Sequence, residues 1–142
     1  MKRLFVLIAS LSLAACAGMM SGGGTVRVNL SGAEEVPPVS VPGSGSGSIT
    51  IGEDGSVTGS VTTTGVEGTA AHIHIGARGA NGPVIVPLTK SGHAYSAPAG
   101  AKLNDAQMKA FKAGNLYVNV HTARNKGGEV RGQLLPAQSS SY

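Results

Sequence analysis

Histidine is the residue type of this chain best suited to chemistry, and its spacing is informative. His72 and His74 alternate with Ile73 and Ile75. Residues i and i+2 of a β-strand share a face, so both imidazoles would project from one face while the isoleucines point towards a core. Two imidazoles about 6.6 Å apart along a strand can converge on one metal ion.

A second stretch with the same alternation ends in His121. Tyr117, Asn119 and His121 would share one strand face, and the valines between them would occupy the other. Three imidazoles without a thiolate suit copper or zinc better than calcium or magnesium. We therefore predict a copper site, with zinc as the alternative, formed by His72, His74 and His121.

His93, between Gly92 and Ala94, is the remaining histidine and a candidate fourth ligand. The histidines also have a plainer interpretation, because a His-X-His on a strand is often a polar face whose rings bond to backbone or water. Because His121 lies on a second predicted strand, the metal interpretation and the polar-face interpretation carry equal weight.

The sequence offers little for covalent catalysis. The single cysteine is Cys16, and neither a Gly-X-Ser-X-Gly motif nor a phosphate-binding glycine loop is present. Glu34 and Glu35 would lie on opposite faces of an extended segment, which makes them a poor acid–base pair. Any reaction would therefore depend on a bound metal.

The elements that position the histidines are predicted to be short strands. The chain has 22 Gly and 7 Pro in 142 residues, no Trp and only 13% charged residues, which excludes a coiled coil or a helical bundle. Runs of β-branched residues separated by turns predict an all-β, Greek-key-like sandwich or barrel of about seven or more antiparallel strands. We place these strands at 25–30, 47–51, 57–63, 70–75, 84–88, 115–121 and 129–135.

Two segments need separate interpretation. The Gly-Ser stretch 43–48 predicts either a wide loop or a small-residue strand where backbones approach closely. Asn104 and Gln107 have the spacing of a capping box, and Gly114 can end a helix in the left-handed conformation. They predict one short helix over about 105–113, with Phe111 covering one end of the β core.

The N-terminus is predicted to be a targeting signal. A basic start is followed by an apolar run over 4–15, which is shorter than the roughly 20 residues that span a bilayer. The run ends in the segment 13–16, which resembles a bacterial lipobox. The resemblance implies a signal peptide, residues 1–15, cleaved before a lipidated Cys16.

Lipidation would place the rest of the chain in the cell envelope. We predict a flexible tether over 16–24, a β domain over 25–136 and a frayed tail over 137–142. Without an Asp after Cys16, the resemblance to lipoproteins implies the outer membrane, facing the periplasm. Removing Lys2 and Arg3 leaves 9 basic and 7 acidic side chains, a net charge of +2 that indicates no nucleic-acid partner.

Three blocks of the sequence resemble the CHRD domain, named for its occurrence in chordin. The resemblance spans 26–135 and implies an all-β domain, but it implies no particular activity. Lys126 stands where Pro is expected, although the two glycines after it are retained. The blocks lie at 30–39, 71–84 and 114–133.

A more distant likeness runs to copper–zinc superoxide dismutase. It implies that the same three histidines are copper ligands and that Arg131 lies near them. The chain lacks that family's cysteine pair, its zinc-binding Asp-His cluster and its bridging histidine. For Glu129 and Arg131 we prefer a structural ion pair that fixes the last strand, with Asn119 and both of these residues beside the site.

These observations give three functional hypotheses in order of preference. The first is a lipid-anchored module that buffers, delivers or detoxifies copper. The second is an interaction module without metal, which would bind an envelope protein. The third is a copper enzyme of the dismutase type. We expect a monomer or a weak oligomer.

Overall fold

The computed structural model describes residues 23–137. The predicted signal peptide, the lipidation site Cys16 and most of the tether and tail therefore lie outside the described residues. Within 23–137, no helix is both long and apolar enough to cross a membrane. Gly24 pairs with Ile51 and belongs to the first strand.

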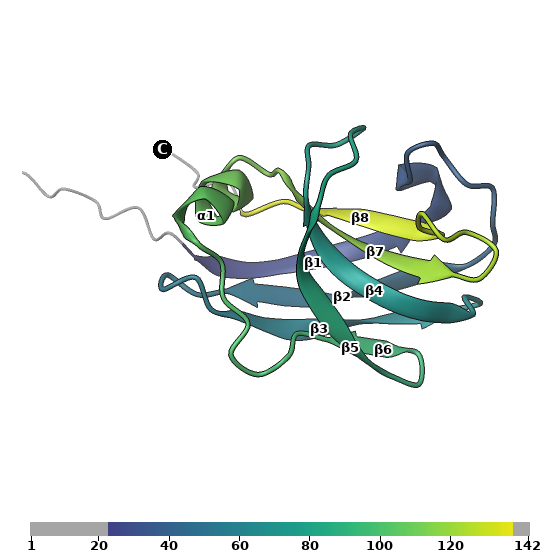
Figure 1. The fold of residues 1–142 in the computed structure, drawn as a ribbon, viewed down its shortest axis with the longest axis horizontal. Helices are drawn as coiled ribbons and strands as arrows, with labels where there is room; N and C mark the ends of the chain where they lie inside the picture. Colours follow the sequence, from purple (N-terminus) through teal and green to yellow (C-terminus); the bar gives the residue numbers. More distant parts are fainter. Residues whose placement is uncertain (1–22, 138–142) are drawn as a thin grey trace, which may run out of the picture.

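The described chain forms a closed barrel of eight antiparallel strands (Figure 1). Their spatial order is β1-β2-β3-β6-β5-β4-β7-β8, so two connections cross over as in a Greek key, and the predicted fold class is confirmed. The strands are β1 (Gly24–Ser31), β2 (Ser44–Ile51), β3 (Val57–Thr64), β4 (Gly68–Ile75), β5 (Val84–Ser91), β6 (Ala94–Ser96), β7 (Leu116–Thr122) and β8 (Val130–Leu134).

All seven predicted strands are present, and the eighth, β6, was not predicted. β6 has three residues and pairs with both β3 and β5, so it closes the barrel between them. Three residues are too few to show an alternating pattern, which explains why the sequence does not reveal this strand.

The Gly-Ser stretch is part of β2, in line with the second of its two interpretations. Gly47 lies between Val28 of β1 and Val61 of β3. A methyl group at Gly47 would collide with the carbonyl oxygen of Ser60, so only glycine fits here. The small residues of β2 thus let its two neighbours pack closely.

The predicted helix is α1 (Asp105–Lys112), which lies at one end of the barrel (Figure 1). Asn104 and Gln107 form the full capping box, with hydrogen bonds of 2.9 Å in both directions. Gly114 follows the helix with a φ of 75°. Phe111 is buried in the core, as the sequence predicts.

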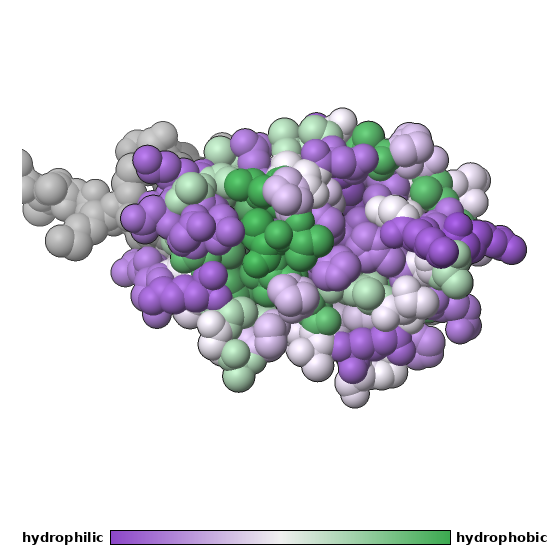
Figure 2. Space-filling view, viewed as in Figure 1, coloured by the Kyte–Doolittle hydropathy of each residue, from purple (hydrophilic) through white to green (hydrophobic). Residues whose placement is uncertain are grey.

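The interior of the barrel is aliphatic and well closed. Twenty buried residues form one cluster, to which Val, Ile and Leu contribute most. Apolar atoms also gather on the surface beside α1, whereas the rest of this face is largely polar (Figure 2). Among residues 23–137, the large apolar side chains that are well exposed are Val84 and Leu135.

Two loops lie against each other outside the sheet formed by β4, β7 and β8. One follows β1 and contains the short 3-10 helix η1 (Gly32–Glu34), and the other joins β4 to β5 over 76–83. Asn81 donates a hydrogen bond of 2.8 Å to the carbonyl of Val36, and Arg78 pairs with Glu34. The loops therefore enclose a polar layer between themselves and the outer face of the barrel.

The packing of β2 gives a first prediction. Gly47→Ala should destabilise the fold by roughly 1–3 kcal/mol, because the added methyl group overpacks a closed site between strands. Gly24→Ala is the matched control, since nothing lies within 4 Å of a methyl group there, and its effect should stay within about 0.5 kcal/mol. Urea unfolding of both variants tests this, and equal stabilities would contradict it.

Candidate metal site

The three predicted ligands lie on the outer face of β4 and β7. In the antiparallel register, His72 stands opposite Asn119, and His74 stands opposite Tyr117. Ile73 is fully buried on the inner face, so the predicted alternation of the strand holds. His121, two positions beyond Asn119, projects from the same face, and one nitrogen from each of the three rings lies within 4.8 Å of the others.

The rings of the three histidines are mutually close but not all in contact. The Nδ1 atom of His72 and the Nε2 atom of His121 are 2.9 Å apart, so the two imidazoles share a hydrogen bond. Their ring centroids are 4.8 Å apart, and those of His74 lie 5.6 Å from His72 and 6.0 Å from His121. The three rings thus surround a common point from two strands.

Backbone carbonyls fix the orientation of two of the rings. Nδ1 of His74 lies 2.8 Å from the carbonyl oxygen of Gly82, and Nδ1 of His121 lies 2.8 Å from that of Lys126. A carbonyl oxygen only accepts, so both Nδ1 atoms carry the proton and both Nε2 atoms present a lone pair. Metal-ligating histidines are typically oriented in this way, by a hydrogen bond from the ring nitrogen that does not bind the metal.

The lone pair on Nε2 of His74 has no partner. This atom is buried and makes no hydrogen bond, although a buried nitrogen acceptor normally has one. The other nitrogen of the same ring is bonded to the Gly82 carbonyl. The cluster therefore contains a buried nitrogen whose lone pair receives no hydrogen bond.

Burial keeps two of the imidazoles neutral. Desolvation lowers the pKa of His72 and His74 below the usual 6.5, and in each case the charge of neighbouring imidazoles lowers it further. A hydrogen bond from His74 to Gly82 works against this shift without reversing it. Neutral rings are the form that binds a metal ion, so the site is ready for a ligand at neutral pH.

The fourth predicted ligand does not join the cluster. His93 is exposed in the turn between β5 and β6, where its carbonyl accepts a hydrogen bond of 2.9 Å from Thr63. The group of three histidines excludes it. Lys126, the departure from the expected proline, contributes only its backbone carbonyl to His121, which a change of side chain preserves.

Tyr117 of β7 and Arg131 of β8 pack beside the site. The Tyr117 ring is stacked on His74, with centroids 4.7 Å apart, and the guanidinium carbon of Arg131 lies 3.4 Å from the Tyr117 centroid. Arg131 is buried and donates hydrogen bonds to the carbonyls of Ala77 and Ala80 at 3.1 and 2.9 Å. It therefore holds the 76–83 loop that supplies the Gly82 carbonyl.

The predicted ion pair between Glu129 and Arg131 is wrong. Glu129 lies just before β8 and accepts hydrogen bonds from Thr122 and from Asn125 at 3.1 Å, while Arg131 faces the 76–83 loop. Strand alternation does not extend to Glu129, because the strand begins only at the next residue. Each residue fixes a different loop.

Glu35 is a buried carboxyl that sequence reasoning missed. It is 4% exposed, whereas Glu34 forms the surface ion pair with Arg78. Burial raises the pKa of Glu35 to about 7, although the nearby charge of Arg131 and a hydrogen bond from Asn119 both lower it. Glu35 lies in the segment 30–39, the first block of the resemblance to the CHRD domain. No local pattern in that segment indicates that the side chain of Glu35 is buried.

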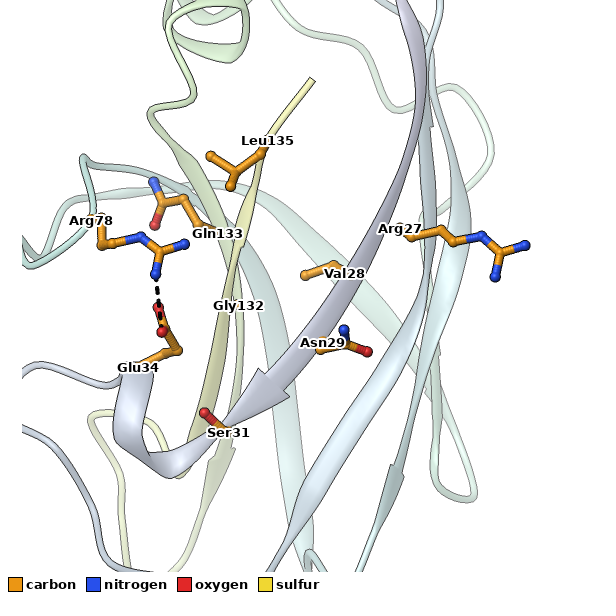
Figure 3. A pocket seen from close by; sticks show the side chains of 9 residues that line it. All are labelled: Arg27, Val28, Asn29, Ser31, Glu34, Arg78, Gly132, Gln133 and Leu135. Atoms are coloured by element: carbon orange, nitrogen blue, oxygen red, sulfur yellow. Dashed lines mark hydrogen bonds and ion pairs between the residues drawn. The ribbon is translucent and has the colours of Figure 1, made fainter. Parts of the chain in front are cut away.

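The pocket in the seam between β1 and β8 is a separate feature (Figure 3). These strands pair only at Ser31 and Arg131, so they diverge beyond that point. The ion pair of Arg78 and Glu34 stands on one side of the pocket, and Arg27 points away from it (Figure 3). None of the three clustered histidines lines this pocket.

The spacing of His72 and His121 is close to that of two ligands of a tetrahedral transition-metal ion. Two nitrogens bound to such an ion at about 2.0–2.1 Å lie roughly 3.3 Å apart. The pair formed by His72 and His121, at 2.9 Å, would have to open by only a few tenths of an ångström. An ion would then replace the proton that the two rings share.

Comparison with known proteins identifies a single family. The family model described as the CHRD domain matches residues 26–134, which is more than half of the 142-residue chain. No curated protein matches the chain, and no solved structure matches it either.

Glu35 gives a prediction for stability. Its folded pKa of about 7 exceeds the ordinary 4.5, so the folded state binds more protons in this range and stability falls as pH rises through it. Relative to Glu35→Gln, the wild type should lose about 3 kcal/mol of unfolding free energy between pH 4 and pH 8. The histidines are the same in both proteins, so their contribution to the pH dependence of the unfolding free energy cancels in the comparison.

Urea unfolding at several pH values measures this difference. Glu34→Gln is the matched control, because its carboxyl is at the surface and paired with an exposed arginine. The same pH dependence in both variants would show that burial of Glu35 does not govern the effect.

Proposed function

The chain belongs to the CHRD domain family, and on that premise we propose that it is a metal-binding β module of the cell envelope. Its ligands are His72, His74 and His121, and its metal is copper, with zinc as the alternative. The role that follows from a module with a metal site and no further chemistry of its own is metal buffering, delivery or tolerance.

One observation carries this proposal. Nε2 of His74 is buried without a partner, and it belongs to a group of three imidazoles whose donor atoms lie within 4.8 Å of one another. If the histidines were only polar packing residues, both ring nitrogens of a buried imidazole would find partners. A metal ion satisfies the lone pair that the protein leaves open.

The donor set supports the choice of metal. Imidazole nitrogens suit copper and zinc, and copper(II) forms the more stable complexes of the two with a given set of nitrogen ligands. The described residues bring no thiolate to the site, since the single cysteine of the chain is Cys16. Competition by protons is small at neutral pH, because burial lowers the pKa of His72 and His74.

Arg131 gives no support to a dismutase-like activity. That likeness would place Arg131 near the metal, and a reaction there would need its charge to be accessible. Here the guanidinium is 1% exposed, donates to the carbonyls of Ala77 and Ala80, and lies over the Tyr117 ring. We therefore propose binding rather than a reaction.

Metal titration tests the proposal. The full chain, purified without an affinity tag, should bind one equivalent of copper(II) or zinc(II) in competition with a chelator. His72→Ala, His74→Ala and His121→Ala should each weaken binding at least about tenfold, because each removes a ligand. His93→Ala is the matched control and should bind like the wild type, since His93 lies outside the cluster.

Two results would contradict the metal site. One is an affinity that none of the three substitutions in the cluster changes. The other is an affinity that depends on His93, which would place the metal in the turn between β5 and β6.

The lipid anchor is a second part of the proposal. It is supported by the likeness of 13–16 to a lipobox and by the position of the single cysteine. Cys16→Ala should move the protein from the membrane fraction to the soluble fraction of a bacterial host. Mass spectrometry of the wild type should find Cys16 acylated at a new N-terminus, and an unmodified Cys16 in the membrane fraction would contradict the anchor.

A further inference from the structure

Three buried polar atoms near the histidines have no hydrogen-bond partner. They are Nε2 of His74, Oδ1 of Asn119 and Oε1 of Glu35. Asn119 stands directly opposite His72 on β7, on the face that carries His121. The Asn119 amide therefore lies between the histidine cluster and the buried carboxyl.

The orientation of the Asn119 amide is set by its surroundings. Its Nδ2 atom donates a hydrogen bond of 3.3 Å to the carbonyl of Gly127, so the opposite orientation would place two acceptors together. Glu35 lies on the same side, because a methyl group at Gly128 would collide with both Oε1 of Glu35 and Nδ2 of Asn119. The amide nitrogen thus faces two acceptors, and the oxygen is left for the other side.

That other side is His74. The Asn119 side chain contacts the imidazole of His74, which lies diagonally across the β4–β7 pair from it. Nδ1 of His74 donates to the Gly82 carbonyl and Nδ2 of Asn119 donates to the Gly127 carbonyl, so the atoms left for this contact are Nε2 of His74 and Oδ1 of Asn119. Both atoms are buried without a partner, and two lone pairs therefore face each other.

A cation is the species that satisfies two facing lone pairs. We propose that Oδ1 of Asn119 is the fourth ligand of the metal held by His72, His74 and His121, and that it makes the site selective for divalent ions. This inference rests on the proposed metal-binding function. It completes a set of four ligands, three nitrogens and one oxygen, all supplied by β4 and β7.

The oxygen ligand decides which ions fit. An amide oxygen is a hard donor that suits zinc(II) and copper(II), whereas copper(I) prefers soft sulfur ligands. The buried carboxyl of Glu35 lies beside the amide nitrogen, so it leaves the carbonyl oxygen of Asn119 free for an ion. Asn119 is therefore expected to contribute to the affinity for divalent ions and little to that for copper(I).

Two variants of the full chain test this ligand. Asn119→Ala removes the oxygen and should weaken copper(II) and zinc(II) binding about tenfold or more, with copper(I) affinity changed less than about threefold. Asn119→Asp keeps an oxygen and adds charge, so it should bind copper(II) at least as tightly as the wild type. The electron paramagnetic resonance spectrum of bound copper(II) should change in both variants.

The possible outcomes separate this inference from the proposed function. No metal bound by the wild type would overturn both. Wild-type copper(II) affinity and an unchanged spectrum in Asn119→Ala would overturn the fourth ligand alone, as would equal losses of copper(I) and copper(II). If Asn119→Ala does not fold, Asn119→Asp decides, and weaker copper(II) binding by that folded variant would overturn the inference.

A control variant shows whether the loss of any buried polar side chain would have the same effect. Thr63→Val removes a buried hydroxyl on β3, away from β4 and β7. It should leave the affinities and the spectrum of bound copper(II) unchanged. A change comparable to that of Asn119→Ala would show that general loosening of the barrel, rather than loss of a ligand, explains the result.

Discussion

The buried guanidinium of Arg131 is the interaction on which the site depends. Burying a charge is costly unless hydrogen bonds compensate it, and Arg131 is compensated by backbone carbonyls of the 76–83 loop and by the face of Tyr117. Through these bonds the last strand holds a loop that lies more than 50 positions earlier in the chain. That loop places the Gly82 carbonyl against His74, and so a cation on β8 determines the tautomer of a ring on β4.

The histidine cluster lies outside the hydrophobic core. The barrel interior is filled by aliphatic side chains, and the polar groups lie between the outer face of β4, β7 and β8 and the two loops. Burial in that layer has opposite effects on the two kinds of titratable group. It raises the pKa of Glu35 and lowers the pKa of His72 and His74, so each tends towards its neutral form.

The sequence predicts what depends on local periodicity. Alternation with a period of two places His72, His74 and His121 on one face, and the capping box predicts α1 almost to its ends. The burial of Glu35 and the roles of Arg131 depend on contacts between segments far apart in sequence, which no local pattern encodes. The wrong pairing of Glu129 with Arg131 came from extending strand periodicity one residue beyond the strand.

The arrangement of protons connects the metal-free fold to the proposed function. His72 donates from Nδ1 to His121, whose own Nδ1 donates to the Lys126 carbonyl. An ion between these rings would displace that shared proton, and the half-exposed His72 can carry it on its other nitrogen. For His74 no such rearrangement is needed, because its Nε2 atom is already bare. An unsatisfied buried acceptor costs about 1–3 kcal/mol, and binding of an ion would relieve that cost. The fold is therefore expected to be more stable with metal than without it.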